Sequence, residues 1–281
     1  MELGRKKILF VVNRDKPNAQ DMCRRLSALA KSEGFDCAEE HVYPVNPKAF
    51  DGALLCCVIG GDGTILACLD GAVKYGVPIL GVNLGKLGFM ATFTDAIEDA
   101  EFLKILRGQA QESVRTLISA TSCGCEKLAL NEFAIKSSNA AGILTVSVYA
   151  NDEYVADFVG DGLIISTPTG TSAYNLSAGG PLIYPQARAY VLTCICPHTL
   201  THRSIVFDDS MTLKAKVHNP NAILIADGKP VEGWNMRESI CFSVPRQTVK
   251  FLQAKEHSHF YILRTKLGWG ENPGRPDSRV R

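Results

Sequence analysis

The feature that most constrains the fold is a glycine-rich pentad directly behind a run of apolar residues. Residues 53–59 are apolar throughout, and Gly-Gly-Asp-Gly-Thr follows at residues 60–64. A continuous apolar run that stops at glycines is typical of a buried strand in a parallel sheet. Glycine adopts backbone angles closed to other residues and leaves N–H groups bare for phosphate oxygens. The pattern predicts a phosphate-handling turn in which Asp62 takes a proton from a hydroxyl. The other candidate site residues of the pentad are Gly61, Gly63 and Thr64.

A second glycine-rich loop, residues 83–89, follows the next apolar run at residues 79–82. Because parallel strands end at the same edge of a sheet, the two loops are expected to form a crevice. Lys86 either neutralises a phosphate there or is a solvated loop residue. The pentad by itself also fits a turn that only reverses the chain. The sequence has no P-loop motif and no Gly-x-Gly-x-x-Gly after the first strand, which disfavours P-loop NTPases and Rossmann dehydrogenases.

The pattern of apolar residues along the chain changes near residue 113. Before it, apolar strand-like runs alternate with helix-like runs, which predicts an α/β domain with a parallel sheet. Its expected strands are 8–12, 54–59 and 79–82, and its expected helices are 22–30 and 65–75. After it, short alternating runs predict a mainly antiparallel, β-rich domain. Its expected strands are 144–149, 154–159, 163–167, 211–217 and 223–226. We predict domains at 1–112 and 113–255, then a C-terminal segment at 256–281.

Composition excludes some function classes. The formal net charge is +1 and the pI is near 7.5. The chain as a whole therefore has no electrostatic field that would attract nucleic acid or a membrane surface. No apolar stretch approaches the roughly 20 residues that span a bilayer, and no signal-peptide core is visible, which predicts a cytoplasmic protein. The ten cysteines lack the two-residue spacing of zinc knuckles. They are expected to be reduced thiols, and no metal-ligand set is predicted.

Two motifs of the β-rich domain are candidates for nucleotide binding. Asn131 offers an amide for an adenine edge, and Glu132 offers a carboxylate that accepts ribose hydroxyls. This pair also fits a solvated turn at a strand end. In residues 160–181, a strand ends in hydroxyls and glycines and then restarts as a short helix. Its hydroxyls and the flat ring of Tyr174 suit a nucleoside, although a helix cap with a core tyrosine fits as well.

The chain resembles the NAD kinases. The resemblance runs in the family's order through the pentad, Asn131-Glu132, Asp161-Gly162, residues 167–174 and residues 265–269, and covers most of the chain. The pentad is shared with diacylglycerol-type lipid kinases and is similar to one in phosphofructokinases, whereas the combination is specific to NAD kinases. The chain departs from many relatives at Thr171-Ser172, where they carry Ser-Thr, and at Val159, where they carry a basic residue.

The resemblance implies ATP-dependent phosphorylation of the 2′-hydroxyl on the adenosine ribose of NAD, yielding NADP. It implies that Asp62 is the general base, that Mg²⁺ arrives on the ATP phosphates, and that the protein is a homodimer or homotetramer. It also implies two domains with the active site between them and a C-terminal segment that packs back on the first domain. The implied NAD contacts are Asn131, Glu132, Asp161, Ser172, Ala173, Tyr174, Asn175, Leu176, Ser177 and Lys229. The alternatives are a lipid kinase and a dinucleotide-binding regulator without catalysis.

Overall fold

The structure, a computed structural model, describes residues 7–85, 88–139, 142–253 and 258–269. The chain folds as two units: the first joins Met1–Ser113 with Lys250–Arg281, and the second is Val114–Val249. The second unit ends before residue 255 because β19 (Thr248–Gln253) pairs with a strand of the first unit. The predicted fold class, an α/β domain and a β-rich antiparallel domain, is confirmed.

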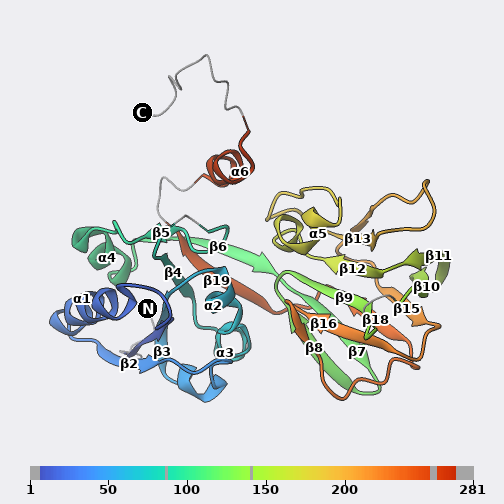
Figure 1. The fold of residues 1–281 in the computed structure, drawn as a ribbon. Coiled ribbons are helices and arrows are strands. Elements are labelled where there is room, and N and C mark those ends of the chain that lie inside the picture. The colour runs from blue at the N-terminus through green and yellow to red at the C-terminus, as the bar shows by residue number, and fades with distance from the viewer. Residues whose placement is uncertain (1–6, 86–87, 140–141, 254–257, 270–281) are drawn as a thin grey trace, which may run out of the picture. The chain divides into compact units, whose positions relative to one another are not determined.

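A sheet in which β1 to β5 and β19 run parallel forms the centre of the first unit (Figure 1). Its strand order is β2-β1-β3-β4-β19-β6, and β5 pairs with β4. The other strands are β1 (Lys7–Val12), β2 (Asp36–Glu40), β3 (Ala53–Ile59), β4 (Ile79–Asn83), β5 (Phe93–Thr94) and β6 (Gln111–Thr116). Ile59 lies opposite Val82 in register, so the loops that follow β3 and β4 leave the same edge of the sheet. This confirms the expected placement of the two glycine-rich loops.

Helices complete the first unit. They are α1 (Ala19–Ser32), η1 (Pro47–Phe50), α2 (Asp62–Leu66), α3 (Leu69–Tyr75) and α4 (Asp99–Leu106). The apolar faces of α1 and α4 share one core with the sheet. The single helix predicted over residues 65–75 is instead two helices. At the break between them, the Ala67 carbonyl accepts a hydrogen bond from the distant Val45 N–H at 3.3 Å.

Two six-stranded antiparallel sheets form the second unit. One has the order β11-β10-β15-β18-β7-β8 and the other the order β14-β13-β12-β9-β16-β17. Their strands are β7 (Ile118–Ser122), β8 (Cys125–Ala129), β9 (Glu132–Ser137), β10 (Leu144–Ala150), β11 (Glu153–Gly160), β12 (Gly162–Ser166), β13 (Ala189–Ile195), β14 (Ile205–Asp208), β15 (Leu213–Val217), β16 (Ala222–Ala226), β17 (Lys229–Pro230) and β18 (Ile240–Ser243). The rings of Phe133 and Phe242, one from each sheet, lie 5.6 Å apart in a shared core. The sheets therefore pack face to face as a sandwich.

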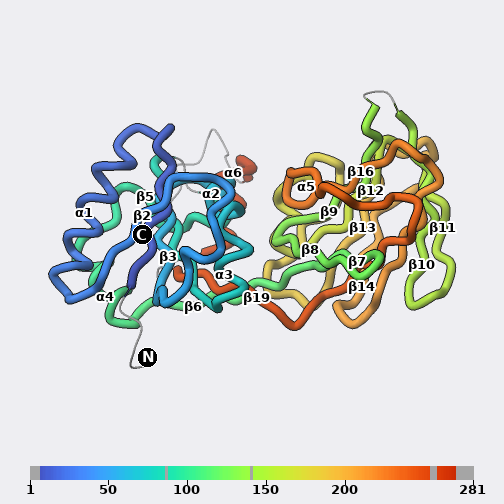
Figure 2. Tube along the Cα trace, turned by 90° about the horizontal axis from the view of Figure 1, so that it is seen from below, coloured from blue at the N-terminus to red at the C-terminus, as the bar shows by residue number. Residues whose placement is uncertain are grey.

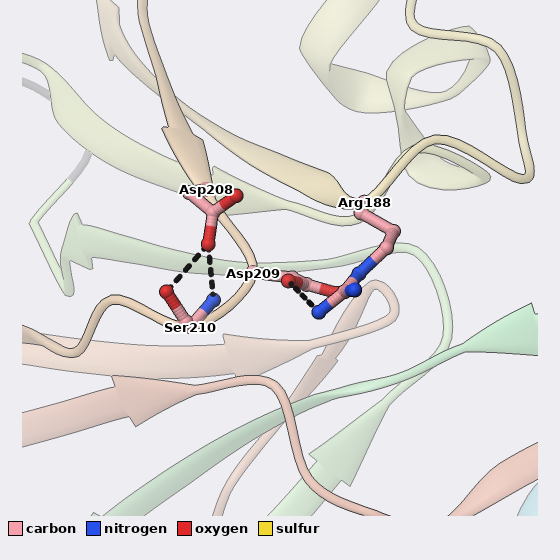
Figure 3. Close-up of polar contacts among 4 residues, drawn as sticks. All are labelled: Arg188, Asp208, Asp209 and Ser210. Atoms are coloured by element: carbon pink, nitrogen blue, oxygen red, sulfur yellow. Dashed lines mark hydrogen bonds and ion pairs between the residues drawn. The ribbon is translucent and has the colours of Figure 1, made fainter.

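Tight turns hold the hairpins of the second unit. Asn151-Asp152 joins β10 to β11, and Asp227-Gly228 joins β16 to β17. All four residues have positive φ, as two-residue type I′ turns require. The start of β13 is tied to the end of β14 by Arg188, whose guanidinium donates to both carboxylate oxygens of Asp209 at 3.0 and 3.1 Å (Figure 3). In the same turn, Asp208 accepts hydrogen bonds from the N–H and the hydroxyl of Ser210.

The C-terminal part of the chain returns to the first sheet at β19, which lies between β4 and β6 (Figures 1 and 2). The helix α6 (His259–Leu267) follows. The packing of residues 256–281 on the first domain stays a prediction, and residues 254–257 and 270–281 lie outside the described residues. The search of the described residues for a helix that could cross a membrane found none. All ten cysteines carry free thiols, and five of them are buried.

Candidate functional site

The glycines of the pentad differ from one another in what the fold demands of them. None of the three has a positive φ, so the expectation of unusual backbone angles here was wrong. Gly60 is required by packing, because a Cβ at that position would lie 2.5 Å from the Thr64 hydroxyl oxygen. Its N–H is also not bare, since it donates to the Val82 carbonyl at 2.9 Å. Thr64 itself is buried, and its hydroxyl accepts from the Asn13 amide.

Gly61 and Gly63 stand in open space. Apart from the adjoining residues and the backbone of α2 itself, no atom of the described residues lies within 4 Å of where a Cβ would be placed at either position. Their N–H groups have no acceptor within the described part of the chain. Both glycines lie at the start of α2, where backbone donors lack helical partners. The fold therefore does not explain these two glycines, whereas the close approach of an anion to the backbone would.

The Asp62 carboxylate is held by the backbone of the second glycine-rich loop. Its Oδ2 accepts from the Phe89 N–H at 3.0 Å. Its Oδ1 accepts from the N–H groups of Met90 and Ala91 at 3.2 and 3.1 Å. A Cβ on Gly88 would lie 2.3 Å from Oδ1, so the loop approaches the carboxylate as closely as a glycine allows. Because each carboxylate oxygen accepts about two hydrogen bonds, Oδ2 keeps one lone pair for a further donor.

The Asn131-Glu132 turn between β8 and β9 is buried and fixed through its main chain. The Asn131 carbonyl accepts from the Thr167 N–H at 2.9 Å and from the Ser166 hydroxyl at 3.3 Å. On its other side, the N–H groups of Leu130, Asn131 and Glu132 all donate to the Asp227 carboxylate. The Asn131 side-chain amide makes no hydrogen bond within the described residues. The main chain is thus held on both sides, and the amide is left for a ligand.

Glu132 carries a buried carboxyl group whose hydrogen-bonding capacity is not fully used. The residue is only 6% exposed, and its Oε2 has no hydrogen-bond partner among the described residues. Burial, and next the negative charge of Asp227, raise the pKa of Glu132 to about 8, while the Tyr174 backbone N–H acts in the opposite direction. A buried carboxyl oxygen without a partner is costly, and a ligand hydroxyl would relieve that cost.

The segment after β12 folds as two short helical turns, η2 (Gly170–Ser172) and α5 (Tyr174–Ser177). The Thr167 hydroxyl donates to the Leu130 carbonyl at 2.6 Å and accepts from the Gly170 N–H at 3.1 Å. A Cβ on Gly170 would stand 2.0 Å from the Asn131 carbonyl oxygen, so only glycine fits there. This segment and the Asn131-Glu132 turn therefore form one packed assembly.

The predicted nucleoside contacts in this segment differ in availability. The Asn175 side chain is fully buried and already engaged, since its amide donates to the Pro181 carbonyl and its oxygen accepts from the Thr193 hydroxyl. The Ser172 hydroxyl donates to the Thr169 carbonyl at 3.1 Å. By contrast, Ser172, Ala173, Tyr174 and Leu176 are partly exposed and Ser177 is exposed.

The remaining predicted contacts lie at the surface of the second unit. Asp161 is exposed, and its carboxylate raises the pKa of the neighbouring Cys196 thiol. Lys229 is exposed on β17. The Lys136 ammonium lies 5.7 Å from the centroid of the Tyr174 ring, a cation–π contact. Lys136 was not singled out from the sequence, because a lone strand lysine carries no signal there.

The structure also shows what sequence reasoning missed in this region. Asp227 is not among the predicted site residues, although its carboxylate joins the turn after β16 to the turn before β9. Lys86, the candidate for neutralising a phosphate, lies outside the described residues. The described residues contain no group of three or more His, Cys, Asp or Glu side chains arranged to hold a metal ion.

Family models match both parts of the chain. The model of the ATP-NAD kinase N-terminal domain matches residues 42–109, and that of the ATP-NAD kinase C-terminal domain matches residues 130–254. The NAD kinase of Lachnoclostridium phytofermentans is 36% identical over 285 residues, which span 94% of this chain and 99% of that protein. The NAD kinase of Aquifex aeolicus is 33% identical over 280 residues, covering 95% and 100% of the two chains.

Solved structures share the fold. A yeast NADH kinase complexed with NADH aligns with a TM-score of 0.85 at 19% identity, covering 97% of this chain and 90% of that chain. An NAD kinase from Archaeoglobus fulgidus in complex with ATP aligns with a TM-score of 0.80 at 22% identity, covering 93% and 98%. These sequence relatives extend over nearly the whole chain. The protein therefore belongs to the ATP-NAD kinase family.

Proposed function

We propose that the protein carries out the reaction of its family, ATP-dependent phosphorylation of the 2′-hydroxyl on the adenosine ribose of NAD, with Asp62 as the general base. It is a phosphotransferase with an alcohol group as acceptor. The single observation that carries the proposal is the contrast within the pentad. Gly61 and Gly63 offer bare N–H groups and open space that the fold does not need, directly beside an oriented carboxylate.

The proposed chemistry needs few protein groups. The Asp62 Oδ2 accepts the proton of the 2′-hydroxyl while the ribose oxygen bonds to the γ-phosphorus of ATP. The bond from that phosphorus to the β,γ-bridging oxygen breaks, ADP leaves, and the proton passes to solvent. Phosphoryl transfer depends mainly on positioning and charge neutralisation. The three N–H groups that orient Asp62 supply the first of these.

We propose that the second unit binds the dinucleotide. The Asn131 amide and the unpartnered Oε2 of Glu132 support contacts to an adenine edge and to ribose hydroxyls. Asp161 is proposed as a ribose contact. The partly exposed surface of residues 172–177 and Lys229 are proposed to hold the rest of the adenosine half. Asn175 is proposed to act indirectly, because its side chain is already bonded within the fold.

The metal, the assembly and the location are proposals that the family resemblance supports. We propose that Mg²⁺ enters as the MgATP complex and is therefore part of the substrate, where it would neutralise phosphate charge with few protein ligands. We further propose a cytoplasmic homodimer or homotetramer. Light scattering of the purified protein measures the number of subunits and tests the second proposal.

The activity is tested by incubating the protein with NAD, ATP and magnesium and measuring NADP with an NADP-specific dehydrogenase. We expect NADP to accumulate with ADP in equal amounts. A lipid kinase would leave NAD unchanged and phosphorylate diacylglycerol in the parallel reaction. A dinucleotide-binding regulator would bind NAD in calorimetry and form no product, and either result would refute the proposed reaction.

A Gly61→Ala substitution separates a glycine kept for the ligand from one kept for the fold. The new methyl group meets no described atom within 4 Å and the backbone angles suit alanine, so the melting temperature is expected to stay near that of the wild type. The KM for ATP is expected to rise about 10-fold or more, because the methyl group obstructs the approach of phosphate to the N–H groups. Gly60→Ala is the comparison, since its clash with Thr64 should lower the melting temperature as well. An unchanged KM for ATP in Gly61→Ala would remove the pentad from the phosphate site.

A further inference from the structure

We propose that Asp227 is a positioning residue for NAD recognition: its carboxylate holds the Asn131-Glu132 turn in the binding geometry, and its charge governs when Glu132 can accept the ribose hydroxyls. This inference rests on the proposed function. Asp227 belongs to neither glycine-rich loop and was not among the expected site residues.

Geometry is the first support. Asp227 Oδ1 accepts from the Asn131 N–H at 2.7 Å and from the Glu132 N–H at 3.2 Å, and its Oδ2 accepts from the Leu130 N–H at 2.9 Å. The Asp227 N–H in turn donates to the Glu132 carbonyl at 3.0 Å. Hydrogen bonds to an ionised acceptor are about twice as strong as neutral ones. The Asp227 side chain thus determines where three consecutive backbone N–H groups of the Asn131-Glu132 turn lie.

Turn chemistry alone does not account for an aspartate here. Asp227 and Gly228 both have positive φ, and a type I′ turn accepts Asn-Gly at least as well as Asp-Gly. Asparagine would thus serve the hairpin equally well. At residue 227, however, asparagine would replace one acceptor oxygen with an NH₂ group, whose N–H donors would face the backbone N–H donors of the Asn131-Glu132 turn. The Asp227 carboxylate is therefore needed to hold the Asn131-Glu132 turn, and not to form the hairpin of β16 and β17 in which Asp227 lies.

Charge is the second support. Burial is the largest cause that raises the pKa of Glu132; the Asp227 carboxylate raises it further, and the Tyr174 backbone N–H lowers it. Burial raises the pKa of Asp227 itself, while the N–H groups of the Asn131-Glu132 turn and the charge of Lys127 favour its ionised form. Ribose hydroxyls donate to a carboxylate, so NAD favours ionised Glu132. With a pKa of about 8 for Glu132, NAD must displace a proton at neutral pH. NAD binding is therefore expected to tighten as the pH rises towards 8 and to level off above it.

The test compares wild type, Asp227→Asn and Asp152→Asn by measuring KM for NAD, kcat and the calorimetric Kd for NAD from pH 6 to pH 9. For Asp227→Asn we expect kcat/KM for NAD to fall about 100-fold through a raised KM, because the turn is displaced. We also expect the midpoint of its pH dependence to move down by about one pH unit, because a like charge near Glu132 is gone. Asp152→Asn makes the same change in another turn of this unit, at a residue paired with Lys214, and should match the wild type.

Each outcome decides something. A folded Asp227→Asn protein with the KM and pH midpoint of the wild type would overturn the inference. Should that variant fail to fold, Asp227→Ser keeps a small acceptor without charge and is measured in the same way. If the wild type binds NAD but forms no NADP, the proposed function fails, while the Kd of each variant still tests Asp227. A raised KM together with a lowered pH midpoint supports the inference, because disrupted packing alone predicts no shift of the midpoint.

Discussion

Asp62→Asn is expected to lower kcat about 1,000-fold while NAD still binds. A positioned general base contributes about 10²- to 10⁴-fold to rate, and the amide of asparagine cannot take the hydroxyl proton. A loss of this size is about 4 kcal/mol of transition-state stabilisation. The proposed NAD contacts lie in the second unit, so the calorimetric Kd for NAD is expected to change little. Initial rates of NADP formation and calorimetry on the same preparation measure both quantities.

The structure identifies a second effect that this experiment must separate. The Asp62 carboxylate holds the N–H groups of Phe89, Met90 and Ala91, and asparagine retains only one acceptor oxygen for them. A loss of about 1–3 kcal/mol in the free energy of unfolding of the first unit is therefore expected as well. Asp99→Asn at the start of α4 is the control: it should leave the rate unchanged and cost no more than about 1 kcal/mol, because its ion pair with Arg25 at 3.6 Å is largely exposed. Near-normal kcat in Asp62→Asn would rule out Asp62 as the base.

Gly170→Ala is expected to lower both stability and NAD affinity. The added methyl group would stand 2.0 Å from the Asn131 carbonyl oxygen and 2.4 Å from its carbonyl carbon, so backbone has to move. Overpacking of this kind costs about 1–3 kcal/mol in the free energy of unfolding. Because the displaced backbone carries Asn131 and Glu132, we expect kcat/KM for NAD to fall about 100-fold. Thermal unfolding and steady-state kinetics measure the two effects.

A control for Gly170→Ala needs a comparable loss of stability elsewhere in the second unit. Gly124, in the turn between β7 and β8, has a φ of 78° and open space around it, so alanine there strains the backbone without a clash. Gly124→Ala should lower the melting temperature and keep the wild-type KM for NAD. If both variants changed KM equally, the contact between Gly170 and Asn131 would have no special bearing on NAD.

Much of the fold could be predicted because local patterns and the sheet agree. The buried strands β3 and β4 are continuous apolar runs, and their adjacency places both glycine-rich loops at one edge. Strand β2 was missed because its sequence, Asp-Cys-Ala-Glu-Glu, has the polarity of an exposed loop, and it forms a strand through its pairing with β1. The break between α2 and α3 was missed for a related reason, since it involves a distant donor, the Val45 N–H.

The candidate site likewise contains residues that could be predicted from the sequence and residues that could not. Asp62 and the Asn131-Glu132 turn could be identified from the sequence because they stand at strand ends within recognisable motifs. The hydrogen-bond partners that hold these residues in place could not be identified from the sequence. The donors to Asp62 come from residues 89–91, and the acceptor for the Asn131-Glu132 turn is Asp227, nearly a hundred positions further along the chain. Local sequence likewise could not tell Gly60, which the packing requires, from Gly61, which it does not.

The position of β19 between β4 and β6 has a consequence for biosynthesis. The second unit, Val114–Val249, is inserted between two pieces of the first. A ribosome therefore completes the whole sandwich before it makes the strand that fills the gap in the parallel sheet. Domains fold during synthesis as their residues emerge, so the nascent N-terminal piece waits with the edge of β4 uncovered at Ile79 and Leu80, where β19 later pairs, while β5 covers Val82 and Asn83. Asp62, the proposed general base, thus resides in the unit whose sheet is the last to be finished.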